Sequence, residues 1–156
     1  MQVEIDITDE SWRSVDRLEQ IIAAASTAAA NALGGDIAGR SMGVRLAGNA
    51  EVRALNKQYR GKDKSTNILS FGADLNAAHW PSGEPLPLGD VILAHGVVKA
   101  EAADFGKKIE SHLTHLIVHG VLHLAGYDHE DADTADEMEA LEVQILAGLG
   151  IENPYD

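Results

Sequence analysis

The sequence predicts an α+β fold, in which about five helices pack on a small mixed sheet of four strands within a single domain spanning residues 1–156. Segments with the two-residue alternation of strands and segments with helical periodicity follow one another without strict alternation, which is typical of this class. The chain has 156 residues, of which 45% are hydrophobic, and it contains no repeat, linker or low-complexity segment. One hydrophobic core therefore accounts for it most simply.

The first third of the chain is predicted to form a strand, a long helix and a second strand. Residues 2–7 alternate apolar and polar side chains, which indicates a strand with one buried face. Thr8 or Asp9 can cap the helix that follows, and we expect this helix to continue to Leu33, where two glycines end it. Residues 41–47 alternate again and predict the second strand.

The remaining elements follow from periodicity and from turn residues. Asn49 is a candidate N-cap for a helix over residues 50–59, whose inward side would carry Val52, Leu55 and Tyr59. After it we predict a strand at 67–71, a proline-rich loop at 75–87, a strand at 88–94, and helices at 97–105, at 109–125 and from about 131–134 onward.

Composition limits the classes of function. The absence of cysteine excludes disulfides, thiolate ligands and a cysteine nucleophile, so a transition metal would have to rest on histidine and carboxylates. The acidic N-terminus does not suit a signal peptide, and the apolar run at 21–33 is too short to cross a bilayer, so we expect a cytoplasmic protein with no membrane partner.

The charge distribution is uneven. A net charge of −13 argues against a general nucleic-acid-binding surface. Five of the twelve basic residues nevertheless cluster within one short stretch: Arg53, Lys57, Arg60, Lys62 and Lys64. Such a cluster can provide a local phosphate site on an acidic protein, or it can simply be a solvated helix face.

Three histidines near the end of the 109–125 helix carry the clearest chemical pattern. His119 and His123 are four residues apart, so both can face one ion from successive helical turns. Gly126 can adopt the left-handed conformation that ends a helix, after which His129 can return as a third ligand. Three neutral imidazoles and one open position describe a catalytic zinc-type site.

The same spacing occurs in zinc peptidases of the HExxHxxGxxH type, with one difference. In those enzymes a glutamate follows the first histidine and acts as the general base, whereas this chain has Gly120. The metal site survives that difference but the peptidase mechanism does not. We therefore expect a metal site without peptidase activity.

The stretch HGVLHLAGYDH at 119–129 resembles the signature of the YbeY family of bacterial metal-dependent endoribonucleases. YRGKDKSTNILSF at 59–71 resembles a second family block, with Ser65 where the family has proline, and LGDVI at 88–92 resembles a third. The resemblance spans about residues 55–146. It implies an α+β fold, one divalent ion, most simply zinc, on His119, His123 and His129, and endoribonuclease activity in 16S rRNA 3′-end maturation and ribosome quality control.

The resemblance also suggests roles for other residues. Arg60 matches an arginine of the family and is our candidate catalytic residue, since a guanidinium can hold two phosphate oxygens. Lys62, Lys64 and His115 are candidate substrate-binding residues, although solvation for the lysines and a buried hydrogen bond for His115 are equally compatible with the sequence. His112 is expected to be exposed.

The implied partners are ribosomal RNA and the ribosome or its small subunit, and no DNA. Two alternatives stay open at this point. One is a metallohydrolase of another class, and the other is a non-catalytic, metal-bound ribosome assembly factor.

Overall fold

A computed structural model describes residues 1–73, 83–128 and 131–156. Its strands are β1 (Gln2–Ile7), β2 (Ser41–Ala47), β3 (Ile68–Gly72) and β4 (Pro87–Ala94). Its helices are the 3-10 helix η1 (Glu10–Ser14), α1 (Leu18–Leu33), α2 (Gly35–Ala38), α3 (Asn49–Arg60), α4 (His95–Asp104), α5 (Ile109–Leu124) and α6 (Ala132–Gly148).

The four strands form one mixed sheet in the order β1-β2-β4-β3. β1, β2 and β4 are parallel, whereas β3 runs antiparallel to β4 at the edge of the sheet. Together with the helices, this sheet confirms the predicted α+β class, with one short helix, α2, beyond the expected set.

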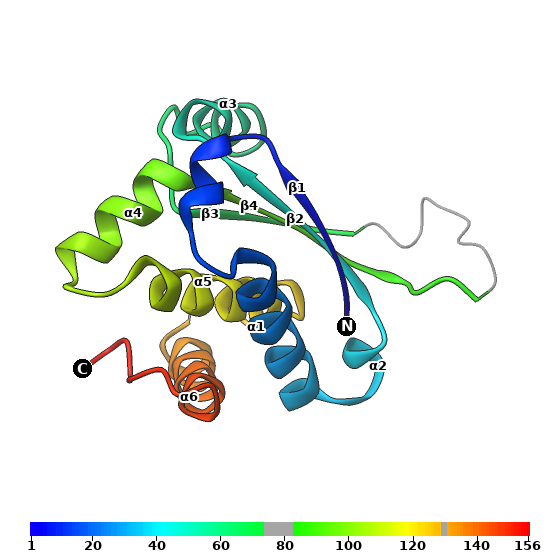
Figure 1. The fold of residues 1–156 in the computed structure, drawn as a ribbon. Coiled ribbons are helices and arrows are strands. Elements are labelled where there is room, and N and C mark those ends of the chain that lie inside the picture. Colours follow the sequence, from blue (N-terminus) through cyan, green and yellow to red (C-terminus); the bar gives the residue numbers. More distant parts are fainter. Residues whose placement is uncertain (74–82, 129–130) are drawn as a thin grey trace.

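The helices cover the two faces of the sheet unequally (Figure 1). α1 and α5 lie along one face, and α6 packs against α5 on the side away from the sheet. The main core fills this side, with Ile22 of α1, Val44 of β2 and Ile117 of α5 all buried. α3 covers one end of the opposite face through a smaller cluster around Val52. α5 is therefore the central helix of the main layer.

The helix predicted between the first two strands is interrupted. η1 ends at Ser14, Arg17 takes a left-handed conformation with φ of 55°, and α1 begins only at Leu18. The reason is tertiary. The buried indole of Trp12 donates a hydrogen bond from Nε1 to the Ala47 carbonyl at 2.8 Å and packs edge-on to His95, so η1 is held against the end of β2.

Two details of α3 also differ from expectation. The Tyr59 side chain is 62% exposed instead of inward, because it lies on the last turn of α3, where it meets Phe71 edge-on at 5.5 Å. Asn49 is the first residue of the helix and not its N-cap, which is Gly48. The Asn49 Oδ1 atom instead accepts a hydrogen bond from the Val97 amide, linking α3 to α4.

Within the described residues, no helix is long and apolar enough to cross a membrane.

Candidate metal centre

Helix α5 carries a row of four histidines at spacings of three and four residues: His112, His115, His119 and His123. Its other side is fixed by packing against the sheet. A Cβ atom added at Gly120 would lie only 3.0 Å from Val91 and 3.1 Å from Ile68, so α5 approaches β4 and β3 closely at this point. Gly120 therefore serves close helix–sheet packing, and its position points into the core instead of toward the histidine row.

A buried carboxylate on α6 organises the row. Glu142 is completely buried, and its two oxygens accept hydrogen bonds from His119 Nδ1 at 2.7 Å and from His115 Nε2 at 3.0 Å. The hydroxyl of Tyr155, near the C-terminus, donates a third hydrogen bond to the same carboxylate. Because an ionised carboxylate can only accept, His119 carries its proton on Nδ1 and His115 carries its proton on Nε2.

These hydrogen bonds decide the charge of Glu142. Burial by itself would raise its pKa, but the hydrogen bonds from His115, His119 and Tyr155 together outweigh it and lower the pKa to about 2. The pKa of Tyr155 shifts in the opposite direction. Burial and the neighbouring carboxylate both raise the pKa of its phenol. Glu142 is therefore an anion and Tyr155 a neutral donor at neutral pH.

His119 and His123 lie on successive turns of α5. Their rings lie parallel within 11°, with centroids 6.4 Å apart. α5 then ends at Leu124, and Gly126 has a φ of 111° where the chain reverses. Thr134 of α6 donates a hydrogen bond to Asp128, which ties this turn to α6.

One hydrogen bond of the row has the form that histidine ligands of metal sites use. In His–metal sites the nitrogen that does not bind the ion usually donates to a carboxylate or a carbonyl, which fixes the tautomer. His119 has the carboxylate part of this arrangement, because Glu142 accepts the hydrogen bond from its Nδ1–H. The third predicted ligand, His129, lies outside the described residues, and within those residues no group of three candidate ligands comes together.

Arg60 lies across the edge strand from the histidine row. It is exposed at the end of α3 and donates from Nη2 to the carbonyl of Ser70 on β3, at 3.1 Å. Two residues earlier on the same strand, Ile68 lies next to Gly120 of α5. The end of α3 and the histidine-bearing helix α5 therefore lie on opposite sides of β3, the edge strand of the sheet.

The other basic residues of the cluster differ in their surroundings. Lys62 and Lys64 are exposed. Arg53 pairs with Asp63 at 2.8 Å, and this hydrogen bond lowers the pKa of the Asp63 carboxyl. Asp63 thus braces the turn after α3.

His112 is buried, which corrects the expectation of an exposed residue. Its Nε2 lies 2.9 Å from Glu101 of α4, and its ring meets the ring of Phe105 edge-on. The short α4–α5 connection folds α4 back beside the first turns of α5, so this end of the row is covered. His115 is partly covered, with 16% of its side chain exposed, and is held by Glu142.

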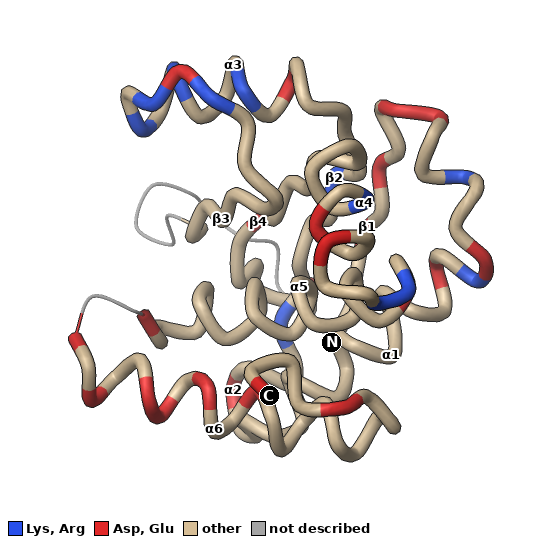
Figure 2. The backbone as a smooth tube through the Cα atoms, turned by 90° about the vertical axis from the view of Figure 1, so that its left-hand side faces the viewer, with Lys and Arg blue, Asp and Glu red and all other residues tan. Residues whose placement is uncertain are grey.

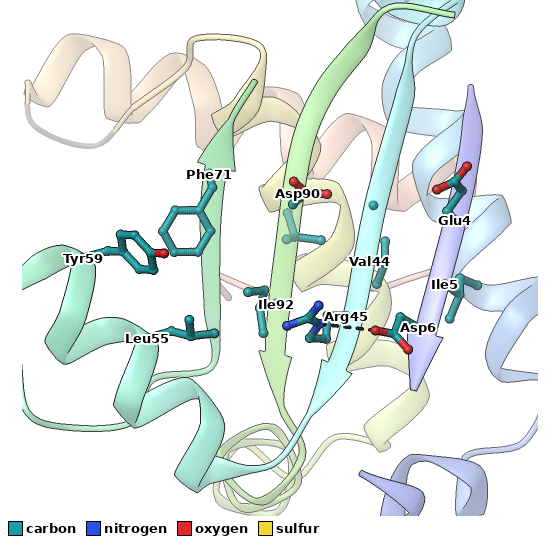
Figure 3. A pocket seen from close by; sticks show the side chains of 12 residues that line it. Glu4, Ile5, Asp6, Val44, Arg45, Leu55, Tyr59, Phe71, Asp90 and Ile92 are labelled. Carbon is teal, nitrogen blue, oxygen red and sulfur yellow. Dashed lines mark ion pairs between the residues drawn. The ribbon is translucent and has the colours of Figure 1, made fainter. Parts of the chain in front are cut away.

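The opposite sheet face carries a groove of different character (Figure 3). Its volume is about 650 Å³, and its polar lining includes the carboxylates Glu4, Asp6 and Asp90. Its arginine, Arg45, is paired with Asp6 at 3.4 Å and also with Glu51 at 3.1 Å. α5 lies behind the sheet in this view, so the groove is separated from the histidine row. Its acidic lining does not suit phosphate.

The charge of the molecule is divided around α5 (Figure 2). Basic residues gather at the α3 end, acidic residues follow α6, and α5 lies between them. Helix α5 therefore lies between a basic and an acidic region of the molecule.

Sequence reasoning did not single out Glu142 or Tyr155. One signal was present, since Glu142 falls on the buried helical stripe of α6 between Met138 and Ile145. A charged residue at a core position calls for a partner. The partner itself lies 23 residues away in sequence, and no local pattern identifies it.

Comparison with known proteins gives a consistent result. A family model described as Endoribonuclease YbeY matches residues 4–150. A protein of that name from Azorhizobium caulinodans is 47% identical and covers 99% of this chain and 96% of its own length. One from Bradyrhizobium diazoefficiens is 44% identical, covering 97% and 84%. A solution structure from Thermotoga maritima, 21% identical, covers 99% of this chain and 96% of its own with a TM-score of 0.58, and supports the fold.

Proposed function

This chain belongs to the Endoribonuclease YbeY family, and we propose that it is a metal-dependent endoribonuclease that cleaves single-stranded RNA in 16S rRNA 3′-end maturation and ribosome quality control. The family consists of RNA-cleaving hydrolases that are generally metal-dependent. The observation that carries the proposal for this chain is the buried Glu142, whose contact with His119 selects the tautomer that a metal ligand requires.

In this proposal one divalent ion is held by His119, His123 and His129. Three imidazoles without a thiolate favour zinc. When bound, such an ion supplies Lewis acidity toward a phosphoryl oxygen and toward water. Glu142 orients His119, and the turn after Gly126 directs the chain toward the third ligand.

The protein's own groups bind and place the RNA. Arg60 holds the reacting phosphate with its planar guanidinium, exchanging the Ser70 carbonyl for phosphate oxygens. Lys62 and Lys64 contact flanking phosphates, and His115 lines the approach to His119. Ribosomal RNA and the small subunit are the partners, DNA is not a substrate, and the cytoplasm is where these partners meet.

Two other functions are less well supported. A peptidase needs a general base after the first histidine, and Gly120 instead faces Val91 and Ile68 in the core. A non-catalytic assembly factor would not require Arg60 to hold a reacting phosphate. Cleavage measurements separate these possibilities.

The test is RNA cleavage on a 16S-derived single-stranded substrate, before and after chelation and zinc re-addition. We expect activity to disappear with chelator, to return with zinc, and to be absent in His119→Ala. Activity that is indifferent to chelator, or retained in His119→Ala, would contradict the metal assignment. Casein cleavage that depends on His123 would favour the peptidase.

Arg60 is tested separately. Arg60→Ala should lose about 10- to 150-fold in cleavage rate at unchanged metal content, because a bond to a charged group contributes about 1.5–3 kcal/mol. Arg60→Lys should recover only part, since an ammonium lacks the planar fork. Arg13→Ala is the matched control, because Arg13 is exposed and pairs with Glu10 three residues earlier in the chain. Wild-type activity in Arg60→Ala would show that Arg60 takes no part in RNA cleavage.

A further inference from the structure

A small cavity lies beside the histidine row, and most of its lining has no role in the mechanism proposed so far. Its volume is about 210 Å³, and it opens between α4, the first half of α5, β3 and the C-terminal residues. Its lining includes Asn67, Glu101, Phe105, His115, His119 and Tyr155. We call it the α4–α5 pocket. Because His119 is one of its walls, the pocket adjoins the proposed metal.

The pocket carries two exposed aromatic rings. Phe105 is 60% exposed at the end of α4, and Tyr155 is 45% exposed near the C-terminus. Because Phe105 is mostly exposed, burial of its ring contributes little to stability. Its ring nevertheless has a partner, since it meets the His112 ring in a T-shaped contact with centroids 5.7 Å apart, and His112 is itself in contact with Glu101. Phe105 thus offers a preorganised apolar ring at the mouth of the pocket.

The polar groups of the pocket favour hydrogen-bond donors on the ligand. Glu101 is partly exposed, with 31% of its side chain accessible. Its Oε1 accepts from Asn67 Nδ2 at 3.0 Å and contacts His112 Nε2 at 2.9 Å, whereas among the described residues Oε2 has a single, longer contact with Asn67, at 3.4 Å. A carboxylate oxygen that retains acceptor capacity binds amino groups such as N4 of cytosine.

We propose that the α4–α5 pocket binds one unpaired, amino-bearing nucleobase of the RNA, with its face on Phe105 and its amino edge toward Glu101. The proposal rests on the proposed function, because it places this base next to the phosphate that Arg60 and the metal hold. A base within a duplex is stacked and paired and cannot enter, so the pocket gives the enzyme a physical reason to select single strands.

The test is a binding titration of the metal-loaded protein with a 2′-O-methyl oligoribonucleotide that carries 2-aminopurine, checked on a gel to remain intact. Stacking on an aromatic ring quenches the fluorescence of 2-aminopurine. Wild type and Phe105→Trp should quench it. Phe105→Ala should lose the quench and bind about 5- to 150-fold more weakly, since one stacked base contributes about 1–3 kcal/mol.

Tyr59→Ala is the matched control, because Tyr59 is equally exposed but lies on the opposite sheet face, in the acidic groove. It should quench as wild type does. Three results would contradict base binding in the α4–α5 pocket. These are no quench in wild type, an unchanged quench in Phe105→Ala, or an equal loss of quench in Tyr59→Ala.

The amino edge is tested by competition. CMP and UMP are pyrimidines of equal size that differ in the N4 amino group, so CMP should displace the oligonucleotide at about tenfold lower concentration. Equal displacement would overturn the role of Glu101.

RNA cleavage by the same preparations separates the two proposals. If the wild-type protein quenches 2-aminopurine fluorescence but does not cleave RNA, the proposed function is contradicted and base binding in the α4–α5 pocket is supported. If the wild-type protein cleaves RNA but Phe105→Ala quenches the fluorescence as wild type does, base binding in the α4–α5 pocket is contradicted and the proposed function is supported.

Discussion

At the scale of single residues, Glu142 is the side chain on which the site depends most. It is fully buried and contacts His119 and His115. Both histidines lie on α5, the helix that carries two of the proposed ligands. Glu142→Gln keeps the shape of the side chain but removes its charge and one acceptor. Such partners typically contribute 10- to 100-fold to metal affinity. We expect zinc affinity to fall within that range in a competition titration with a chromophoric chelator.

A readout that does not depend on bound metal accompanies this prediction. In the metal-free wild type, nitrogen NMR shifts should place the proton of His119 on Nδ1. In Glu142→Gln the two tautomers should mix. An unchanged tautomer together with unchanged zinc affinity would show that Glu142 is only a buried core residue.

The low pKa of Glu142 also predicts a pH dependence of stability. The pKa of this carboxyl is about 2 in the folded chain, against 4.5 for its ordinary value. A lowered pKa contributes stability above the ordinary value, and this contribution is lost as pH falls toward the folded one. In acid unfolding of the metal-free protein, the stability difference between wild type and Glu142→Gln should therefore shrink from pH 4.5 to pH 2. A constant difference over that window would contradict the assignment.

At the scale of elements, α5 is fixed by its close approach to the sheet at Gly120. A glutamate there would have to place a charge among Val91 and Ile68, where even a Cβ atom is crowded. Overpacking and an unpaired buried charge are each destabilising by more than about 1 kcal/mol. Gly120→Glu should therefore lower the melting temperature by at least several degrees and should create no peptidase activity. A melting temperature equal to that of wild type would contradict the close packing of this side of α5 against the sheet.

Most elements could be predicted from periodicity because each has a local signature. Residues 41–47 alternate and form β2 with the expected bounds. The break before α1 could not be predicted, since it depends on the bond from Trp12 to Ala47 across 35 residues. The exposure of Tyr59 likewise depends on how little of the sheet α3 covers.

Of the candidate site, only the placement of His119 and His123 on one helix could be predicted from the sequence. Their spacing is a property of one helix, and both lie on α5; their role as ligands stays a prediction. The contact with Glu142 and the burial of His112 depend on how α6 and α4 pack against that helix. Such contacts between helices leave no local pattern in the sequence.

At the scale of the whole molecule, the divided charge should control how RNA arrives. The net charge of −13 repels RNA at long range, whereas the basic end of α3 attracts it locally. Neutralising two exposed acids on α6, as Asp136→Asn with Glu137→Gln, should raise the association rate about two- to fivefold at low salt. Stopped-flow binding should show the gain vanish near 1 M salt, where the screening length is about 3 Å.

A matched pair at the start of α1 makes the same change in net charge elsewhere: Asp16→Asn, just before the helix, with Glu19→Gln in its first turn. Its effect should be smaller, because it lies away from the divide between α3 and α6. Equal gains from both pairs would mean that only the net charge matters.

The parallel pairing of β1, β2 and β4 has a consequence for the speed of folding. Neither neighbouring pair is joined by a hairpin: β1 and β2 are separated in sequence by α1, and β2 and β4 by α3 and β3. Each pairing must therefore close a long loop before its contacts form, which slows folding relative to helical bundles. Trp12 is buried only when η1 meets the end of β2, so its fluorescence in a Trp80→Phe background would report this late closure directly.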